Sequence, residues 1–202
     1  MNINIDSYYY MRENVFDKIQ NASNIEKVAM AFLMACFTGL LAQIVLPLPW
    51  TPVPITGQTL GVLFSGLFLG KRFGVLSQIF YILGGIGGIA WFNGMNGGLE
   101  AFLGSTCGYF IGFILAAALI GHISEKYRSS RKFKKMFSLM LIANFGCIYI
   151  PGLIGLSIYL YINTGAFPDS ITLLMMGLVP FVLGDLVKIG GATALSKAVL
   201  PK

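Results

Sequence analysis

Charged residues are scarce in this chain of 202 residues, because Asp, Glu, Lys and Arg make up only 11% of it. Soluble domains carry about 25% charged residues, so the composition excludes an ordinary soluble fold. The chain has a single histidine, and its three cysteines fall in apolar runs without metal-ligand spacing. Paired carboxylates and a Ser–His pair, which a membrane-embedded enzyme would use, are missing as well. The sequence therefore predicts neither an enzyme nor a cofactor or metal site.

Long polar stretches are also missing, which leaves no room for a second domain. Apolar runs fill most of the chain instead, and about 20 apolar residues suffice to cross a bilayer. These runs are residues 26–46, 55–70, 74–92, 104–123, 136–163 and 180–199. The sequence predicts an all-α polytopic membrane protein. Its residues 26–202 form a single domain of six transmembrane helices in the lipid bilayer, and residues 1–25 form a cytoplasmic tail.

Basic residues lie on one side of this arrangement. The chain has 14 Lys and Arg residues, and all but Lys188 fall in the tail, in two connectors of one side or near the C-terminus. The only charged residues in the connectors of the other side are Glu100 and Asp169. The positive-inside rule then places both termini in the cytoplasm. The expected location is the inner (plasma) membrane of a bacterium. Topology thus explains the net charge of +6 without a nucleic-acid partner.

Two opposite charges, Asp185 and Lys188, lie inside the last apolar run. A charge at the bilayer centre costs about 2.5–3.5 kcal/mol on insertion scales, so two charges in one helix need a reason. Their i, i+3 spacing places both on one helical face. A structural ion pair between helices is one interpretation. A polar site for a solute is the favoured one, because ionisable groups at membrane depth mark such sites.

Other polar and aromatic candidates lie at the outer ends of the predicted spans. Thr56 and Gln58 follow a connector with four prolines, where they could meet a solute or serve only as a helix cap and a solvated amide. The glycine-rich segment 84–112 suggests a lid over a ligand, or else a packed surface loop. Its candidate residues are Trp91, Phe92, Asn93 and Asn96.

Small residues recur at helical spacing in the first span. Such stripes allow close helix–helix approach in membranes. Internal packing explains most of the stripe, but Ala31 and Ala35 at its inner end could equally face another subunit.

Three segments together resemble one known family. VPITGQTLGVLFSGLFLGKRFGVLSQIFYILGGIGG, FLGSTCGYFIGF and PFVLGDLVK are similar to the BioY family, the biotin-binding S components of energy-coupling-factor transporters. The resemblance covers about residues 28–200. The chain departs from the family pattern at residues 104–109, where GPTGGY is usual, and at residues 90–92, where proline and valine usually precede the phenylalanine. Both departures adjoin the outer mouth.

The resemblance implies six helices, an outward-facing site for biotin, and a transmembrane coupling subunit with two ATPases as partners. It implies substrate contacts for Asp185 and Lys188, and a further one for Asn93 or Asn96. It also implies that Ala31 and Ala35 dock the coupling subunit.

The chemistry of biotin agrees with these assignments. Biotin has a ureido ring with N–H donors and a carbonyl, an apolar body and a carboxylate. Asp185 can accept a ureido N–H, and Lys188 can donate to a ligand oxygen. The rings of Tyr81, Trp91, Phe92 and Tyr109 could cover the apolar body. Another vitamin, a scaffold without a solute, or a membrane-embedded enzyme remain the alternatives.

Overall fold

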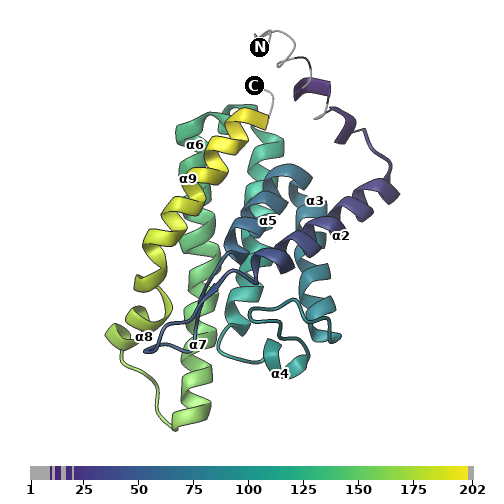
Figure 1. Ribbon diagram of the computed structural model, residues 1–202. Coiled ribbons are helices and arrows are strands. Elements are labelled where there is room, and N and C mark those ends of the chain that lie inside the picture. The colour runs from purple at the N-terminus through teal and green to yellow at the C-terminus, as the bar shows by residue number, and fades with distance from the viewer. Residues whose placement is uncertain (1–9, 11, 15–16, 20, 200–202) are drawn as a thin grey trace.

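The structure is a computed structural model that describes residues 10, 12–14, 17–19 and 21–199. Its helices form a bundle that α2 crosses obliquely (Figure 1). Among these residues, five helical segments are long and apolar enough to cross a membrane, which confirms a helical membrane protein. They are Asn24–Leu41, Gln58–Ile86, Cys107–Lys126, Phe133–Thr164 and Ser170–Lys197. The predicted tail, residues 1–25, lies partly outside the described residues.

Helix α2 (Asn24–Leu41) begins at a capping box. The Ser23 hydroxyl accepts a hydrogen bond from the backbone N–H of Glu26, and the Glu26 carboxylate accepts one from the backbone N–H of Ser23. Two N–H groups that the helix itself cannot pair are thereby satisfied. The local sequence thus sets where the first apolar helix starts.

The small residues of α2 face the interior of the bundle. Ala31, Ala35 and Thr38 are each 0% exposed, and α2 packs against α3 (Gln58–Ile86). The Thr38 hydroxyl accepts a 3.5 Å hydrogen bond from Gln78 of α3, so this stripe is the face that meets α3. Both methyl groups are covered by this chain, and docking of another subunit by Ala31 and Ala35 stays a prediction.

Helix α3 contains both the second and the third predicted spans. It breaks at Gly70, whose φ of 70° and ψ of −169° are non-helical and cost glycine little because it has no Cβ. The two halves then run antiparallel, since the Gln58 amide near one end donates a 2.7 Å hydrogen bond to the Tyr81 hydroxyl near the other. The helix ends at Ile86, so the last residues of the predicted span 74–92 lie outside it.

Helix α5 (Cys107–Lys126) packs against both α3 and α7 (Tyr149–Thr164). Gly108 lies so close to α7 that a Cβ atom there would overlap the Pro151 carbonyl. Small residues permit such close approach between membrane helices. Helix α5 is thereby fixed between α3 and α7, and its residues Tyr109, Phe110 and Phe113 line the cavity described below.

The fifth predicted span is continuous but not uniformly α-helical. It consists of α6 (Phe133–Leu141), a π-helical turn η2 (Ile142–Ile148) and α7. Pro151 has no N–H, and its ring crowds the carbonyl four residues earlier, which lies within η2. The helix accommodates Pro151 by a π-helical widening just before it.

The last span is preceded by a short helix. Helix α8 (Ser170–Gly177) is capped by Asp169, whose carboxylate accepts hydrogen bonds from Thr172 and from the Ile171 backbone. These hydrogen bonds, those from Thr172 above all, hold the pKa of Asp169 below its usual value. A 3-10 turn η3 (Val179–Phe181) then leads into α9 (Val182–Val199).

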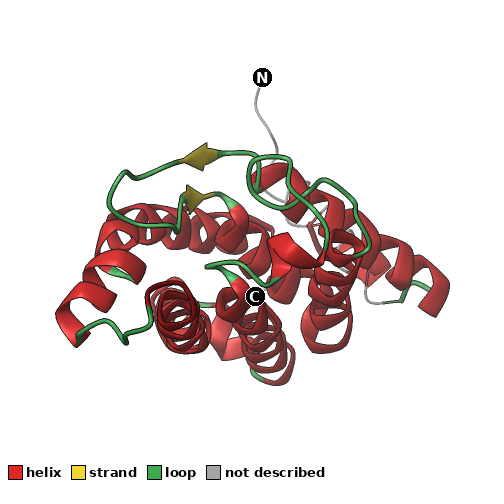
Figure 2. Ribbon diagram, turned by 90° about the horizontal axis from the view of Figure 1, so that it is seen from below, coloured by secondary structure: helices red, strands yellow, loops and turns green. Residues whose placement is uncertain are grey.

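The irregular segments gather at one end of the bundle. They include the antiparallel strands β1 (Val45–Leu46) and β2 (Ile55–Thr56) and the short helix α4 (Leu99–Phe102). Figure 2 shows several helices end-on, with the strands and loops lying across this end. The connection η1 (Arg128–Arg131) and the C-terminal end of α9 lie at the other end (Figure 1).

Candidate solute-binding site

The charged pair opens onto a cavity among α3, α5, α7 and α9. Its polar groups come from the start of α3 and from α9, while aromatic rings from α5, α7 and η3 form much of the wall. The lining residues are Val53, Pro54, Thr56, Gln58, Thr59, Thr106, Tyr109, Phe110, Phe113, Tyr149, Phe181, Asp185 and Lys188. An apolar cavity with a few convergent polar groups is typical of a small-molecule site.

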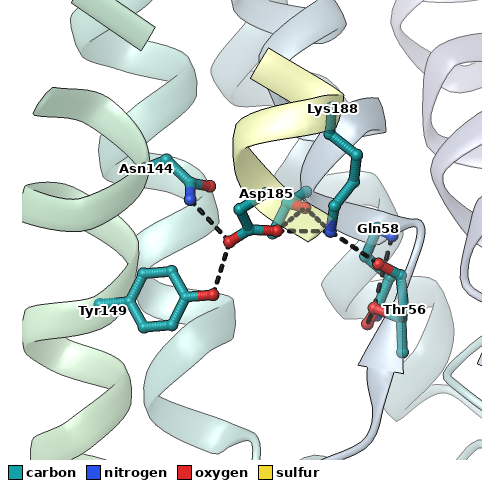
Figure 3. Close-up of polar contacts among 7 residues, drawn as sticks. Thr56, Gln58, Asn144, Tyr149, Asp185 and Lys188 are labelled. Atoms are coloured by element: carbon teal, nitrogen blue, oxygen red, sulfur yellow. Dashed lines mark hydrogen bonds and ion pairs between the residues drawn. The ribbon is translucent and has the colours of Figure 1, made fainter. Parts of the chain in front are cut away.

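Asp185 is 1% exposed and accepts hydrogen bonds on both carboxylate oxygens. Asn144 and Tyr149 donate to Oδ2, at 2.7 Å and 2.5 Å (Figure 3). Oδ1 lies 2.5 Å from the Lys188 ammonium and 3.3 Å from the Thr59 hydroxyl. Because a carboxylate offers about four lone-pair sites, these contacts use all of them and offset the cost of burying the charge.

Lys188 reaches from α9 to the opposite wall of the cavity. Besides the ion pair, its ammonium donates to the Thr56 backbone carbonyl at 2.9 Å and to the Thr59 hydroxyl at 2.6 Å. An ammonium has three donors, so these contacts engage each of them. The sequence predicted that the two charges share a face of the last helix, and the structure pairs them there.

The predicted residues Thr56 and Gln58 also line the cavity. The Thr56 hydroxyl donates to the Gln58 side-chain oxygen at 2.8 Å, and the Gln58 amide donates to Tyr81. The Tyr81 hydroxyl in turn donates to the Trp91 carbonyl at 3.2 Å. Tyr81 is fully buried behind Gln58 and is not among the lining residues. It holds the Gln58 amide in place.

Tyr109 lies in the aromatic wall, as predicted. Its hydroxyl donates to the Gly177 carbonyl at 2.7 Å, which ties α5 to α8. Its ring meets that of Tyr149 edge-on, with centroids 5.9 Å apart. The apolar body of a ligand would contact such ring faces, while the hydroxyl groups point to partners within the chain.

The other predicted residues lie away from the cavity. Trp91 and Phe92 are buried, but they pack on α3 and α5 and are not lining residues. Asn96 is exposed, and its amide donates to the Asn93 backbone carbonyl at 2.8 Å. The structure therefore does not bring these four residues together with Asp185, and a contact between any of them and a solute stays a prediction.

Sequence reasoning missed three residues that bond to the charged pair: Thr59, Asn144 and Tyr149. Asn144 could have been found, because an amide in the middle of the apolar run 136–163 is costly without a partner. Thr59 could also have been considered, because it directly follows the predicted residue Gln58 in the first turn of α3. Tyr149 gave no comparable signal, since the span contains several tyrosines.

The fold and the cavity define a helical membrane protein with a charged pair enclosed among its helices. The family model of the BioY family matches residues 13–202. The chain therefore belongs to the BioY family.

Two relatives are named as biotin transporters. The probable biotin transporter BioY of Methanothermobacter thermautotrophicus is 50% identical over 138 residues, which cover 68% of this chain and 88% of the relative. The biotin transporter BioY of Thermotoga maritima is 36% identical over 145 residues, covering 70% and 78%.

A solved structure is similar as well. It is the crystal structure, at 2.1 Å, of the S-component for biotin from an ECF-type ABC transporter. The TM-score is 0.76 at 25% identity, and the match covers 87% of this chain and 93% of the other. The resemblance inferred from the three sequence segments is thus confirmed.

Proposed function

We propose that this chain is the biotin-binding membrane subunit of an energy-coupling-factor transporter and serves biotin uptake. The observation that carries the proposal is the Asp185–Lys188 pair at the wall of a largely aromatic cavity. Biotin matches this composition with its polar ureido ring, apolar body and carboxylate. The names of the relatives and the fold of the biotin S-component support the same solute. The proposed role is binding and transport, not catalysis.

The same proposal includes the topology. Residues 26–202 form one domain, and the two halves of α3 count as separate spans, which gives six helices with both termini in the cytoplasm. The position of the basic residues supports this orientation. On this arrangement the cavity opens outward in a bacterial plasma membrane. A transmembrane coupling subunit and ATPases act from the inner side.

Direct binding tests the function. The full chain, purified in detergent, is titrated with biotin by calorimetry, with thiamine and riboflavin as comparison solutes. We expect saturable binding of biotin and none of the other two. Binding of another vitamin in place of biotin would redirect the proposal within the transporter class, and no binding of any solute would favour a scaffold.

Thiol labelling tests the orientation. Single cysteines are placed at residues 132 and 96 in a variant without native cysteines, and whole cells are treated with an impermeant maleimide. We expect labelling at residue 96 in intact cells, and at residue 132 only after the membrane is opened. The reverse pattern would invert the topology and place the cavity mouth on the inner side.

A further inference from the structure

Thr59 bridges the two members of the charged pair. It lies in the first turn of α3 and lines the cavity. Its hydroxyl accepts a hydrogen bond from Lys188 at 2.6 Å and donates one to Oδ1 of Asp185 at 3.3 Å. One hydroxyl thus serves as an acceptor for the cation and as a donor for the anion.

The two oxygens of Asp185 differ in how they can be reached. Oδ2 is held by Asn144, which is fully buried and is not among the lining residues, and by Tyr149. Oδ1 is held by Thr59 and Lys188, which both line the cavity. Tyr149 also lines the cavity but Asn144 does not, so both partners of Oδ1 and only one partner of Oδ2 face a solute, while Asn144 and Tyr149 fix the carboxylate to η2 and α7.

A solute cannot bond to this pair without replacing an existing contact. The four contacts of Asp185 use about all the acceptor sites of its carboxylate, and the three contacts of Lys188 use all the donors of its ammonium. The contact from Thr59 to Oδ1, at 3.3 Å, is longer than the contacts from Lys188, Asn144 and Tyr149. A hydroxyl can also rotate to bond a carbonyl three or four residues earlier in the chain. The hydrogen bond from Thr59 to Oδ1 is thus the one most easily exchanged, whereas the bond from Lys188 to Thr59 is short, at 2.6 Å.

We propose that Thr59 is a specificity-determining residue whose hydroxyl competes with the solute for Asp185 and Lys188. This inference rests on the proposed binding of biotin. A solute that carries an N–H donor beside an oxygen acceptor replaces both bonds of the hydroxyl at once. A solute with a donor alone, or an acceptor alone, replaces only one of these two bonds, and the hydroxyl keeps its bond to the other charge.

The test compares biotin affinities of the full-length wild-type protein and its variants by calorimetry in detergent. In Thr59→Val the competing hydroxyl is gone, so we expect biotin to bind roughly threefold to tenfold more tightly, the equivalent of one net hydrogen bond. Thr59→Ser retains the hydroxyl and should bind like the wild type. Thr193→Val is the matched control, because Thr193 is a buried hydroxyl on α9 whose partner is the Met140 sulfur, outside the cavity. Thr59→Ala is the second variant if Thr59→Val cannot be purified.

The outcomes separate this inference from the function on which it rests. Tighter binding by Thr59→Val, with Thr59→Ser and Thr193→Val unchanged, supports competition. Weaker binding by Thr59→Val would mean that Thr59 contacts the ligand directly, and unchanged binding would mean that it does not affect the ligand. Either result overturns the inference, while the proposed binding of biotin stands. Failure of the wild-type protein to bind biotin contradicts the proposed function itself.

Discussion

Two buried regions of the molecule are held by different forces. One is the polar wall of the cavity around Asp185 and Lys188, and the other is the aromatic cluster of Tyr81, Trp91, Phe92 and Phe110. The polar wall depends on hydrogen bonds that join α9 to α3, η2 and α7 through Asp185. The aromatic cluster depends on shape, because Trp91 and Phe92 lie on Gly84 and Gly85 of α3, where no side chain intervenes. Charge holds the first region together, whereas a close fit holds the second.

The aromatic cluster also anchors the outer segment to the bundle. The Phe92 ring lies 4.7 Å from that of Phe110 and 5.5 Å from that of Tyr81, between centroids. The Gln43 amide donates to the carbonyls of Trp91 and Phe92, and its oxygen accepts from the Met95 N–H at 2.9 Å. The segment is therefore fastened largely by contacts away from Asp185 and Lys188, although Phe110 and the hydrogen bonds from Gln58 through Tyr81 to Trp91 connect it to the cavity wall. Substitutions in the two regions should consequently separate stability from binding.

Asp185→Ala should have the largest effect. It leaves the Lys188 ammonium largely buried without its counter-ion, which costs about 3–5 kcal/mol of stability, and it removes the anion that a solute donor would meet. We expect biotin binding to be lost and the thermal unfolding temperature to fall. The double variant Asp185→Ala/Lys188→Met should regain much of the stability but no binding. Full affinity in the double variant would remove the pair from the site.

Tyr149→Phe should weaken the binding of biotin but cost less stability than Asp185→Ala. The substitution removes one of the two donors on Oδ2, and a hydrogen bond to a charged group is worth about 1.5–3 kcal/mol. We expect the biotin affinity measured by calorimetry to fall by about tenfold to a hundredfold. Tyr159→Phe, on the same helix but away from the cavity, is the control. An unchanged affinity would mean that Asn144 alone suffices to orient Asp185.

Gly85→Ala should lower the stability of the protein and leave its affinity for biotin little changed. A methyl group there would overlap the Phe92 ring, and overpacking of this kind costs about 1–3 kcal/mol. We expect a lower unfolding temperature with the affinity for biotin little changed. Gly190→Ala, where a Cβ atom meets nothing within 4 Å, serves as the control. A loss of affinity that exceeds the loss of stability would show that the aromatic cluster shapes the cavity.

Asn96→Ala should have the smallest effect. The side chain is exposed and bonds only within its own segment in this structure, and such surface substitutions change stability within about ±0.5 kcal/mol. Biotin affinity should stay at the wild-type value in the same calorimetric assay. A tenfold loss would instead place Asn96 at the solute, as the family resemblance implies, and would require the segment to move on binding.

The two regions also differ in how far the sequence predicts them. Asp185 and Lys188 were predictable because spacing within one helix sets their common face. Asn144 and Tyr149 contact Asp185 across a long stretch of chain and through a π-helical turn, which no local pattern encodes. The burial of Trp91 and Phe92 away from the cavity depends on which face of α3 presents Gly84 and Gly85. Gly70 likewise reverses the chain without the loop residues that usually mark such a turn.

The reversal at Gly70 has a consequence for membrane thickness. At 1.5 Å per residue, the half of α3 over residues 58–69 rises about 18 Å, well short of a hydrocarbon core of about 30 Å. The residues just before this half are not helical, and Thr51 and Val53 among them are buried. This half of α3 is therefore much shorter than the segment Phe133–Thr164, which makes it the thin side of the bundle. Lipids with shorter acyl chains should match its thin side, and bilayer thickness becomes a variable that sets the stability of the cavity mouth.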